Sequence, residues 1–249
     1  MKNKYVCDKH DYTKYGLLRT IIGASGIRLS VAWMLTPDDG SYDGNHVAYL
    51  GKADAARHDP VLHETLNALM ASGRPRHVGM IQKSNLLLGA TYFSDQVPDD
   101  VPGRKAWSSR LVLESEQADM VFLDPDNGLE VKRPAYGNKG SSKYVYRREV
   151  EMLWKSGKSL VIYQHRPREA WDKCIPRKAK ELKEAAQDSR ITAFVSGDVA
   201  FFLVLQPEHR RFREKITSGV RENWSGWIKI WDHHAPNEGH QTMEACHAD

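Results

Sequence analysis

The chain has 249 residues, of which 41% are hydrophobic and 27% charged, fractions that are typical of a globular protein. No window approaches about 18 consecutive apolar residues, so the sequence excludes a membrane-spanning helix, and the composition argues against collagen, coiled-coil or largely disordered proteins. The first residues lack the apolar segment of a secretory signal, and the three cysteines (Cys7, Cys174 and Cys246) make neither a disulfide framework nor a metal motif. We therefore expect a cytoplasmic protein.

The formal net charge of +4 is unevenly distributed. Residues 1–130 carry 14 Lys and Arg against 17 Asp and Glu, whereas residues 131–249 carry 22 against 15. This basic second half favours an anionic partner such as nucleic acid or a phosphorylated molecule. Ordinary solvated helix faces would give a similar count, so charge alone does not decide between the two interpretations.

Apolar periodicity predicts alternating helices and strands along the chain. Helices are expected at residues 12–22, 60–70, 104–117, 143–156, 167–187 and 208–222. Strands are expected at residues 28–35, 45–50, 76–82, 118–124, 158–164 and 227–231. Residues 83–103 resemble a loop, and residues 191–206 are typical of a hairpin that turns at Gly197-Asp198.

This alternation predicts an α/β fold, with a mostly parallel sheet flanked by helices and a C-terminal antiparallel hairpin. We expect a single Rossmann-like domain over residues 1–234 and a flexible tail at 235–249. The strands ending at Leu35, Gln82, Asp124 and Tyr163 should lie side by side and parallel. In such sheets ligands bind beyond the carboxyl ends of the strands, so the candidate residues are those that follow them.

The clearest candidates follow the expected strand 118–124. Asp124, Asp126 and Asn127 come directly after its apolar residues, with Gly128 allowing an unusual backbone angle. Their side chains can hydrogen-bond a substrate amino group or bind a hard cation, and an Asx turn would use the same residues. With Glu130, the two aspartates could also hold Mg²⁺ in a nuclease.

Further candidates follow the other expected strands. His165 is a candidate general base and Arg166 a candidate phosphate ligand, although a histidine at a strand end often makes an ordinary hydrogen bond. Loop 132–148 interleaves tyrosines with basic residues, including Lys143 and Tyr144, as in nucleic-acid contacts or in a solvated loop. Asp38, Asp39 and Gly40 follow the first strand, where they form either one side of a ligand crevice or a turn, and residues 11–16 are placed to cover that crevice.

The strand pattern and the segment Asp124-Pro125-Asp126-Asn127 resemble the class I S-adenosylmethionine-dependent methyltransferases. Their sheet has seven strands, with the last one reversed and inserted between its neighbours. In amino-group methyltransferases an Asp-Pro-Pro-aromatic motif after the fourth strand holds the target nitrogen, and here Asp126 and Asn127 replace the second Pro and the aromatic residue. The chain is also loosely similar to the partner proteins of three-cysteine-motif proteins.

The resemblance implies the cofactor S-adenosylmethionine, held near Asp38, Asp39 and Gly40, and a nucleic-acid or nucleotide-like substrate. It implies catalytic roles for Asp124 and Asn127, and His165, the candidate general base, is the third expected catalytic residue. Substrate contacts are then expected from the other candidates, which are Asp126, Lys143, Tyr144 and Arg166.

Two other functions are compatible with the sequence. One is the Mg²⁺-dependent nuclease that uses Asp124, Asp126 and Glu130. The other is a non-catalytic Rossmann-like binding partner, because the segment after the first strand lacks the Gly-rich loop of the methyltransferases.

Overall fold

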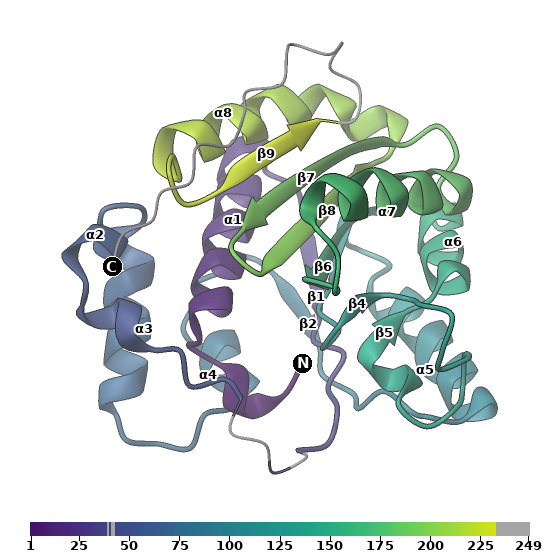
Figure 1. Cartoon of the computed structure of the whole chain (residues 1–249), viewed down its shortest axis with the longest axis horizontal. Helices are drawn as coiled ribbons and strands as arrows, with labels where there is room; N and C mark the ends of the chain where they lie inside the picture. The colour runs from purple at the N-terminus through teal and green to yellow at the C-terminus, as the bar shows by residue number, and fades with distance from the viewer. Residues whose placement is uncertain (39, 41–42, 233–249) are drawn as a thin grey trace.

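The computed structural model describes residues 1–38, 40 and 43–232 (Figure 1). The helices are α1 Lys9–Ser25, α2 Ala53–Ala56, α3 Pro60–Ala71, α4 Val78–Lys83, α5 Val101–Glu114, α6 Arg147–Lys155, α7 Trp171–Ala185 and α8 Arg213–Asn223, with short 3₁₀ helices at Asn3–Tyr5, Ala48–Gly51, Ser141–Lys143 and Pro207–Phe212. The strands are β1 Leu29–Ala32, β2 Thr91–Phe93, β3 Met120–Leu123, β4 Gly128–Leu129, β5 Tyr144–Val145, β6 Ser159–His165, β7 Arg190–Ser196, β8 Val199–Leu205 and β9 Lys229–Asp232.

Seven of these strands form one mixed sheet in the order β2-β1-β3-β6-β8-β7-β9. The strands β2, β1, β3 and β6 are parallel, and β8 runs antiparallel between β6 and β7. The edge strand β9 is antiparallel to β7, and β4 and β5 form a separate parallel pair. The predicted α/β class, the mostly parallel sheet and the C-terminal hairpin are therefore confirmed.

Helices cover both faces of the sheet, and each face has its own hydrophobic core. Along β3, Met120 and Phe122 belong to one core while Val121 and Leu123 belong to the other, as the two-residue period of a strand requires. The first core includes apolar residues of α1, α3, α4 and α8, and the second includes those of α5, α6 and α7. Figure 1 shows these two groups of helices on opposite sides of the sheet.

Capping residues explain where three of the helices begin. The Asp8 carboxylate caps α1 by accepting a hydrogen bond from the His10 amide at 3.0 Å. The left-handed Gly26 ends the same helix. Asp59 and Asp100 cap α3 and α5, each followed by a proline within the first helical turn. Asp8 thereby fixes the residue at which α1 begins.

Several local predictions were wrong. The helix expected at 143–156 begins only at Arg147, because Tyr144–Val145 form β5. Residues 76–82 form the helix α4, because the His77 side chain caps it and its buried residues Val78 and Ile81 have helical spacing. Residues 45–50 contain a 3₁₀ helix rather than a strand. The strand beside β1 is β2, which lies within the segment expected to be a loop. Gln82 therefore does not end a strand of the sheet, and the expected tail at 235–249 lies outside the described residues.

Candidate functional site

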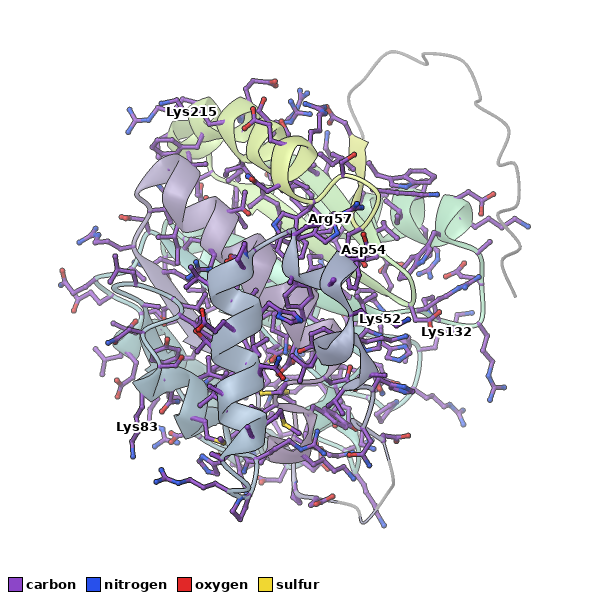
Figure 2. The ribbon with its side chains drawn as sticks, turned by 90° about the vertical axis from the view of Figure 1, so that its left-hand side faces the viewer. Lys52, Asp54, Arg57, Lys83, Lys132 and Lys215 are labelled. Atoms are coloured by element: carbon purple, nitrogen blue, oxygen red, sulfur yellow. The ribbon has the colours of Figure 1, made fainter. Side chains whose placement is uncertain are left out.

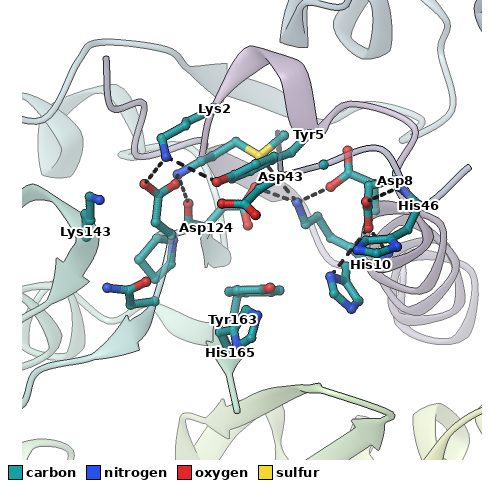
Figure 3. A pocket seen from close by; sticks show the side chains of 17 residues that line it. Lys2, Tyr5, Asp8, His10, Asp43, His46, Asp124, Lys143, Tyr163 and His165 are labelled. Atoms are coloured by element: carbon teal, nitrogen blue, oxygen red, sulfur yellow. Dashed lines mark hydrogen bonds and ion pairs between the residues drawn. The ribbon is translucent and has the colours of Figure 1, made fainter. Parts of the chain in front are cut away.

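A cavity of about 300 Å³ lies at the carboxyl ends of β3 and β6, against the start of α1 (Figure 3). We call it the Asp124–His165 pocket. Its lining residues are Met1, Lys2, Tyr5, Asp8, His10, Asp11, Lys14, Asp43, Gly44, His46, Asp124, Pro125, Asp126, Asn127, Lys143, Tyr163 and His165. The carboxyl edge of the sheet is where the α/β architecture predicted a ligand site.

Asp124 is engaged by a buried cation on α1. The Lys14 ammonium lies 2.7 Å from Asp124 Oδ2 and 2.6 Å from Asp11 Oδ1, and Tyr15 donates its hydroxyl hydrogen to Asp11. Burial raises the pKa of Asp124 to about 6, although Lys14 opposes this shift. Burial also disfavours the charged form of Lys14, but its two carboxylate partners raise the pKa of Lys14 above its usual value. Asp124 therefore lines the pocket as part of a buried network in which the Lys14 ammonium pairs with the carboxylates of Asp11 and Asp124.

Asp126 is engaged in a similar way by the amino-terminal residues. The Met1 ammonium lies 2.7 Å from Asp126 Oδ1 and also donates to the carbonyl oxygens of Met34 and Asp124, each at 3.1 Å. Thr36 donates its hydroxyl hydrogen to Asp126 at 2.8 Å. Burial opposes ionisation, but the Met1 ammonium and the Thr36 hydroxyl lower the pKa of Asp126. The residues Met1 and Thr36 thus join the ends of β1 and β3.

The loop after β3 is held by one side chain of β6. Gln164 accepts a hydrogen bond from the Leu129 amide and donates to the Asn127 carbonyl, at 2.9 and 3.0 Å. Gly128 has φ +117°, and a Cβ atom there would lie 2.4 Å from the Gln164 side chain. Only glycine fits this conformation and this close approach. The arrangement fixes the backbone of Asn127 beside His165, whose amide donates to the Asn127 carbonyl at 3.1 Å.

Lys143 lines the pocket from a segment that two side chains hold in place, Arg104 and Asp99. The buried Arg104 pairs with Glu149 at 2.7 Å and donates to the carbonyl oxygens of Ser141 and Tyr144. Asp99 accepts hydrogen bonds from the amides of Gly140 and Ser142 and from the Ser141 hydroxyl. The 3₁₀ helix that carries Lys143 is therefore held in place on both sides.

Three histidines line the other part of the pocket. Asp8 fixes two of them, since it accepts from the His46 amide at 3.1 Å and its Oδ1 lies 3.5 Å from His10 Nδ1. The His10 and His165 rings stand edge to face with centroids 6.0 Å apart. Burial lowers the pKa of His10 to about 4, with Lys9 and His165 acting in the same direction, so this imidazole is neutral near pH 7. Its buried Nε2 atom has no hydrogen-bond partner among the described residues.

The structure brings together five of the residues singled out from the sequence: Asp124, Asp126, Asn127, Lys143 and His165. The expected cofactor ligands are not part of this group. Asp38 is largely exposed, pairs with Lys4 at 2.9 Å and accepts from the Gly40 amide, as in the alternative interpretation of a turn. Asp39 lies outside the described residues.

Two of the expected substrate ligands also lie outside the pocket lining. Tyr144 belongs to β5, next to Gly128, and Arg166 is exposed, with its guanidinium 3.6 Å from Asp198. Residues 11–16, which the sequence placed as a cover, are part of α1 and contribute Asp11 and Lys14 to the wall.

The three carboxylates proposed for Mg²⁺ do not form one site. Asp124 and Asp126 are paired with Lys14 and Met1, whereas Glu130 lies outside the pocket lining and accepts a hydrogen bond from the Arg147 amide at 2.9 Å. Across residues 1–38, 40 and 43–232, no three His, Cys, Asp or Glu side chains gather in a way that could hold a metal ion. The donor set of this alternative therefore does not fit the cation.

The sequence did not single out His10, Asp8 or Lys14 as chemical groups. One signal was present, because His10 and Lys14 are four residues apart and lie on one face of the helix that Asp8 begins. Pairing Lys14 with Asp124, 110 positions later, required the tertiary structure.

Comparison with known proteins assigns no family, since no protein-family model and no curated protein matches the chain. In the described part of the chain, no helix has both the length and the apolar character needed to cross a membrane.

Proposed function

We propose that this chain is an enzyme that binds a nucleotide, free or within nucleic acid, in the Asp124–His165 pocket, with the neutral His10 imidazole in the pocket wall. The observation that carries the proposal is the division of charge in the pocket. Lys14 and the Met1 ammonium neutralise the buried Asp124 and Asp126, while three histidines, Asn127 and Lys143 also line the cavity. Asp8, Asp11 and Asp43 line the cavity too, so it offers both donors and acceptors, which suits a polar ligand such as a nucleotide, whose base also donates and accepts.

The size and position of the pocket support a small ligand or a single nucleotide unit. Its volume is at the lower end of the range of ligand pockets, and it lies at the carboxyl edge of a Rossmann-like sheet. Lys143 and His165 are suited to phosphate oxygens, and Tyr163 contributes an aromatic ring.

His10 places a neutral imidazole in the wall of the pocket. Its low pKa keeps the imidazole neutral, and a proton on Nδ1 would face Asp8, which leaves the lone pair on Nε2. The buried Nε2 has no hydrogen-bond partner among the described residues, so a ligand reaches this nitrogen only when the side chains around it move.

Methyl transfer is a second candidate, favoured by the strand order. The reversed strand β8 between β6 and β7 matches the arrangement that the methyltransferase resemblance implies, with Asp124-Pro125 at the end of β3. The residues expected to hold S-adenosylmethionine do not fit it, because Asp38 and Gly40 form an exposed turn outside the pocket lining. We therefore derive no step through this cofactor.

Isothermal titration calorimetry separates these functions. We expect at least one nucleoside 5′-monophosphate to bind, and His165→Gln to weaken its binding about tenfold without unfolding the protein, because His165 is exposed. Lys83→Gln, at an exposed residue outside the pocket, is the control. Binding of S-adenosylmethionine in a parallel titration would favour methyl transfer, and nucleotide binding without any turnover would favour the non-catalytic partner. Absence of nucleotide binding would contradict the proposal.

A further inference from the structure

A second hollow adjoins the Asp124–His165 pocket. Its volume is about 260 Å³, and it is bounded by the start of α1, the β7–β8 turn and the segment before β9. We call it the Trp227 hollow; its lining includes Lys9, His10, Asp198 and Trp227. Since His10 lines both cavities, they meet at this residue.

The backbone fixes the turn of the second hollow beside the first pocket. His165, at the end of β6, is paired with Val199 of β8, and the Arg166 amide donates to the Asp198 carbonyl at 2.8 Å. His10 therefore forms part of the wall of both cavities, and its ring stands edge to face against that of His165. Arg166, which the sequence assigned to substrate, lies next to the β7–β8 turn rather than inside the first pocket.

Trp227 provides a fixed aromatic surface in this hollow. Its indole N–H donates to Thr13 at 2.9 Å, and its ring packs against Tyr12 and His58 with centroids 5.6 and 5.4 Å away. The side chain is only half-buried, so part of the ring stays open to the hollow. Lys9 adds a cation on the same helix that carries His10.

A held aromatic ring beside a cation is the combination that binds single-stranded nucleic acid, because bases stack on the ring and phosphates meet the cation. We propose that the Trp227 hollow binds the nucleotide adjacent to the one in the Asp124–His165 pocket, so that the ligand is a single-stranded nucleic acid whose linking phosphate passes His10. This inference rests on the proposed function and identifies its substrate class.

The test compares ligands of different length by calorimetry. The probes are the four ribonucleoside 5′-monophosphates and the corresponding homodinucleotides, titrated into the full chain. The best dinucleotide should bind at least about tenfold more tightly than its mononucleotide, since stacking contributes per base. Trp227→Leu and Lys9→Gln should each remove most of this preference and leave mononucleotide affinity unchanged.

Matched controls are available for both variants. Trp231→Leu changes a half-exposed tryptophan of β9. Lys83→Gln changes a lysine at the end of α4 that points outward (Figure 2) and lines neither cavity. Neither should alter the preference for dinucleotides. Lys9→Gln is a mild change at the helix start, so it tests the inference even if Trp227→Leu fails to fold.

The outcomes distinguish this inference from the proposed function. Equal affinity for mononucleotides and dinucleotides would overturn the second subsite while leaving the nucleotide pocket in place. Variants that weaken both ligands equally would do the same. If neither ligand class binds, the proposed function fails, and the inference fails with it.

Discussion

The Lys14 ammonium on α1 lies 2.7 Å from the Asp124 carboxylate at the end of β3, and both side chains are almost fully buried. This contact links the first helix to the centre of the sheet across 110 residues of sequence. It also changes the expected role of Asp124. A carboxylate at an open strand end can bind substrate directly, whereas a buried one held by Lys14 supports the wall of the site.

Removing the Asp124 charge should therefore destabilise the fold. Asp124→Asn leaves Lys14 buried with Asp11 as its remaining carboxylate partner, and we expect a loss of roughly 3 kcal/mol in the free energy of unfolding. Urea denaturation at pH 7 measures it. Asp95→Asn is the matched control, because Asp95 pairs with Arg110 at the surface and should contribute less than about 1 kcal/mol. A comparable loss for the two variants would contradict the structural role of Asp124.

The second buried pair should control the segment that carries Lys143. Arg104→Lys keeps the charge but loses the fork of hydrogen bonds to Glu149 and to the carbonyl oxygens of Ser141 and Tyr144. We expect faster amide hydrogen exchange in residues 141–145 and a loss of roughly 2 kcal/mol in unfolding free energy. Arg110→Lys on the same helix, at an exposed ion pair, should change neither measurement. Unchanged exchange in Arg104→Lys would refute the anchoring role.

The sheet was largely predictable because its central strands are short apolar runs bounded by polar or turn residues. Residues 118–124, 158–164 and 191–206 carry that signal, and all three segments form strands where expected. The apolar pattern does not predict the edge strand β2 of the sheet. The three residues of β2 are too few to show a period, and the apolar residues of 76–82 suit a short helix as well as a strand.

The site was predictable in position but not in chemistry. Parallel strands bring their carboxyl ends to one edge, so Asp124, Asn127 and His165 converge as expected. Burial and pairing depend on the helix packed against that edge, and the sequence around Asp124 contains no sign of Lys14. The exposed position of Asp38 was unpredictable for a similar reason, since nothing in the sequence around it indicates whether its side chain faces the cavity or solvent.

Gly128 should be irreplaceable in the loop after β3. Gly128→Ala would force a side chain onto φ +117° and within 2.4 Å of Gln164, whose amide is fixed by hydrogen bonds. We expect a loss of at least about 2 kcal/mol in thermal or urea unfolding. Gly23→Ala provides the contrast, because Gly23 is an exposed helical position with open space around it and should gain about 0.5–1 kcal/mol. A neutral Gly128→Ala would show that the loop relaxes around Gln164.

The low pKa of His10 should make stability depend on this residue in mildly acidic solution. Its pKa falls from an ordinary value of about 6.5 in the unfolded chain to about 4 in the folded one, so between these values the unfolded state binds more protons. The contribution of neutral His10 is fully present above pH 6.5 and is lost as the pH falls through 4, by at most about 3 kcal/mol. Asp124, with its pKa raised to about 6, acts in the opposite direction, so wild type alone does not isolate the effect.

The experiment compares wild type with His10→Gln. The difference in unfolding free energy between the two proteins should shift in favour of the variant from pH 7 to pH 4. Histidine NMR titration provides the direct check, in which His10 should stay neutral at pH 5.5. A His10 that titrates near 6.5, with a constant difference in stability, would contradict the effect of burial on this imidazole.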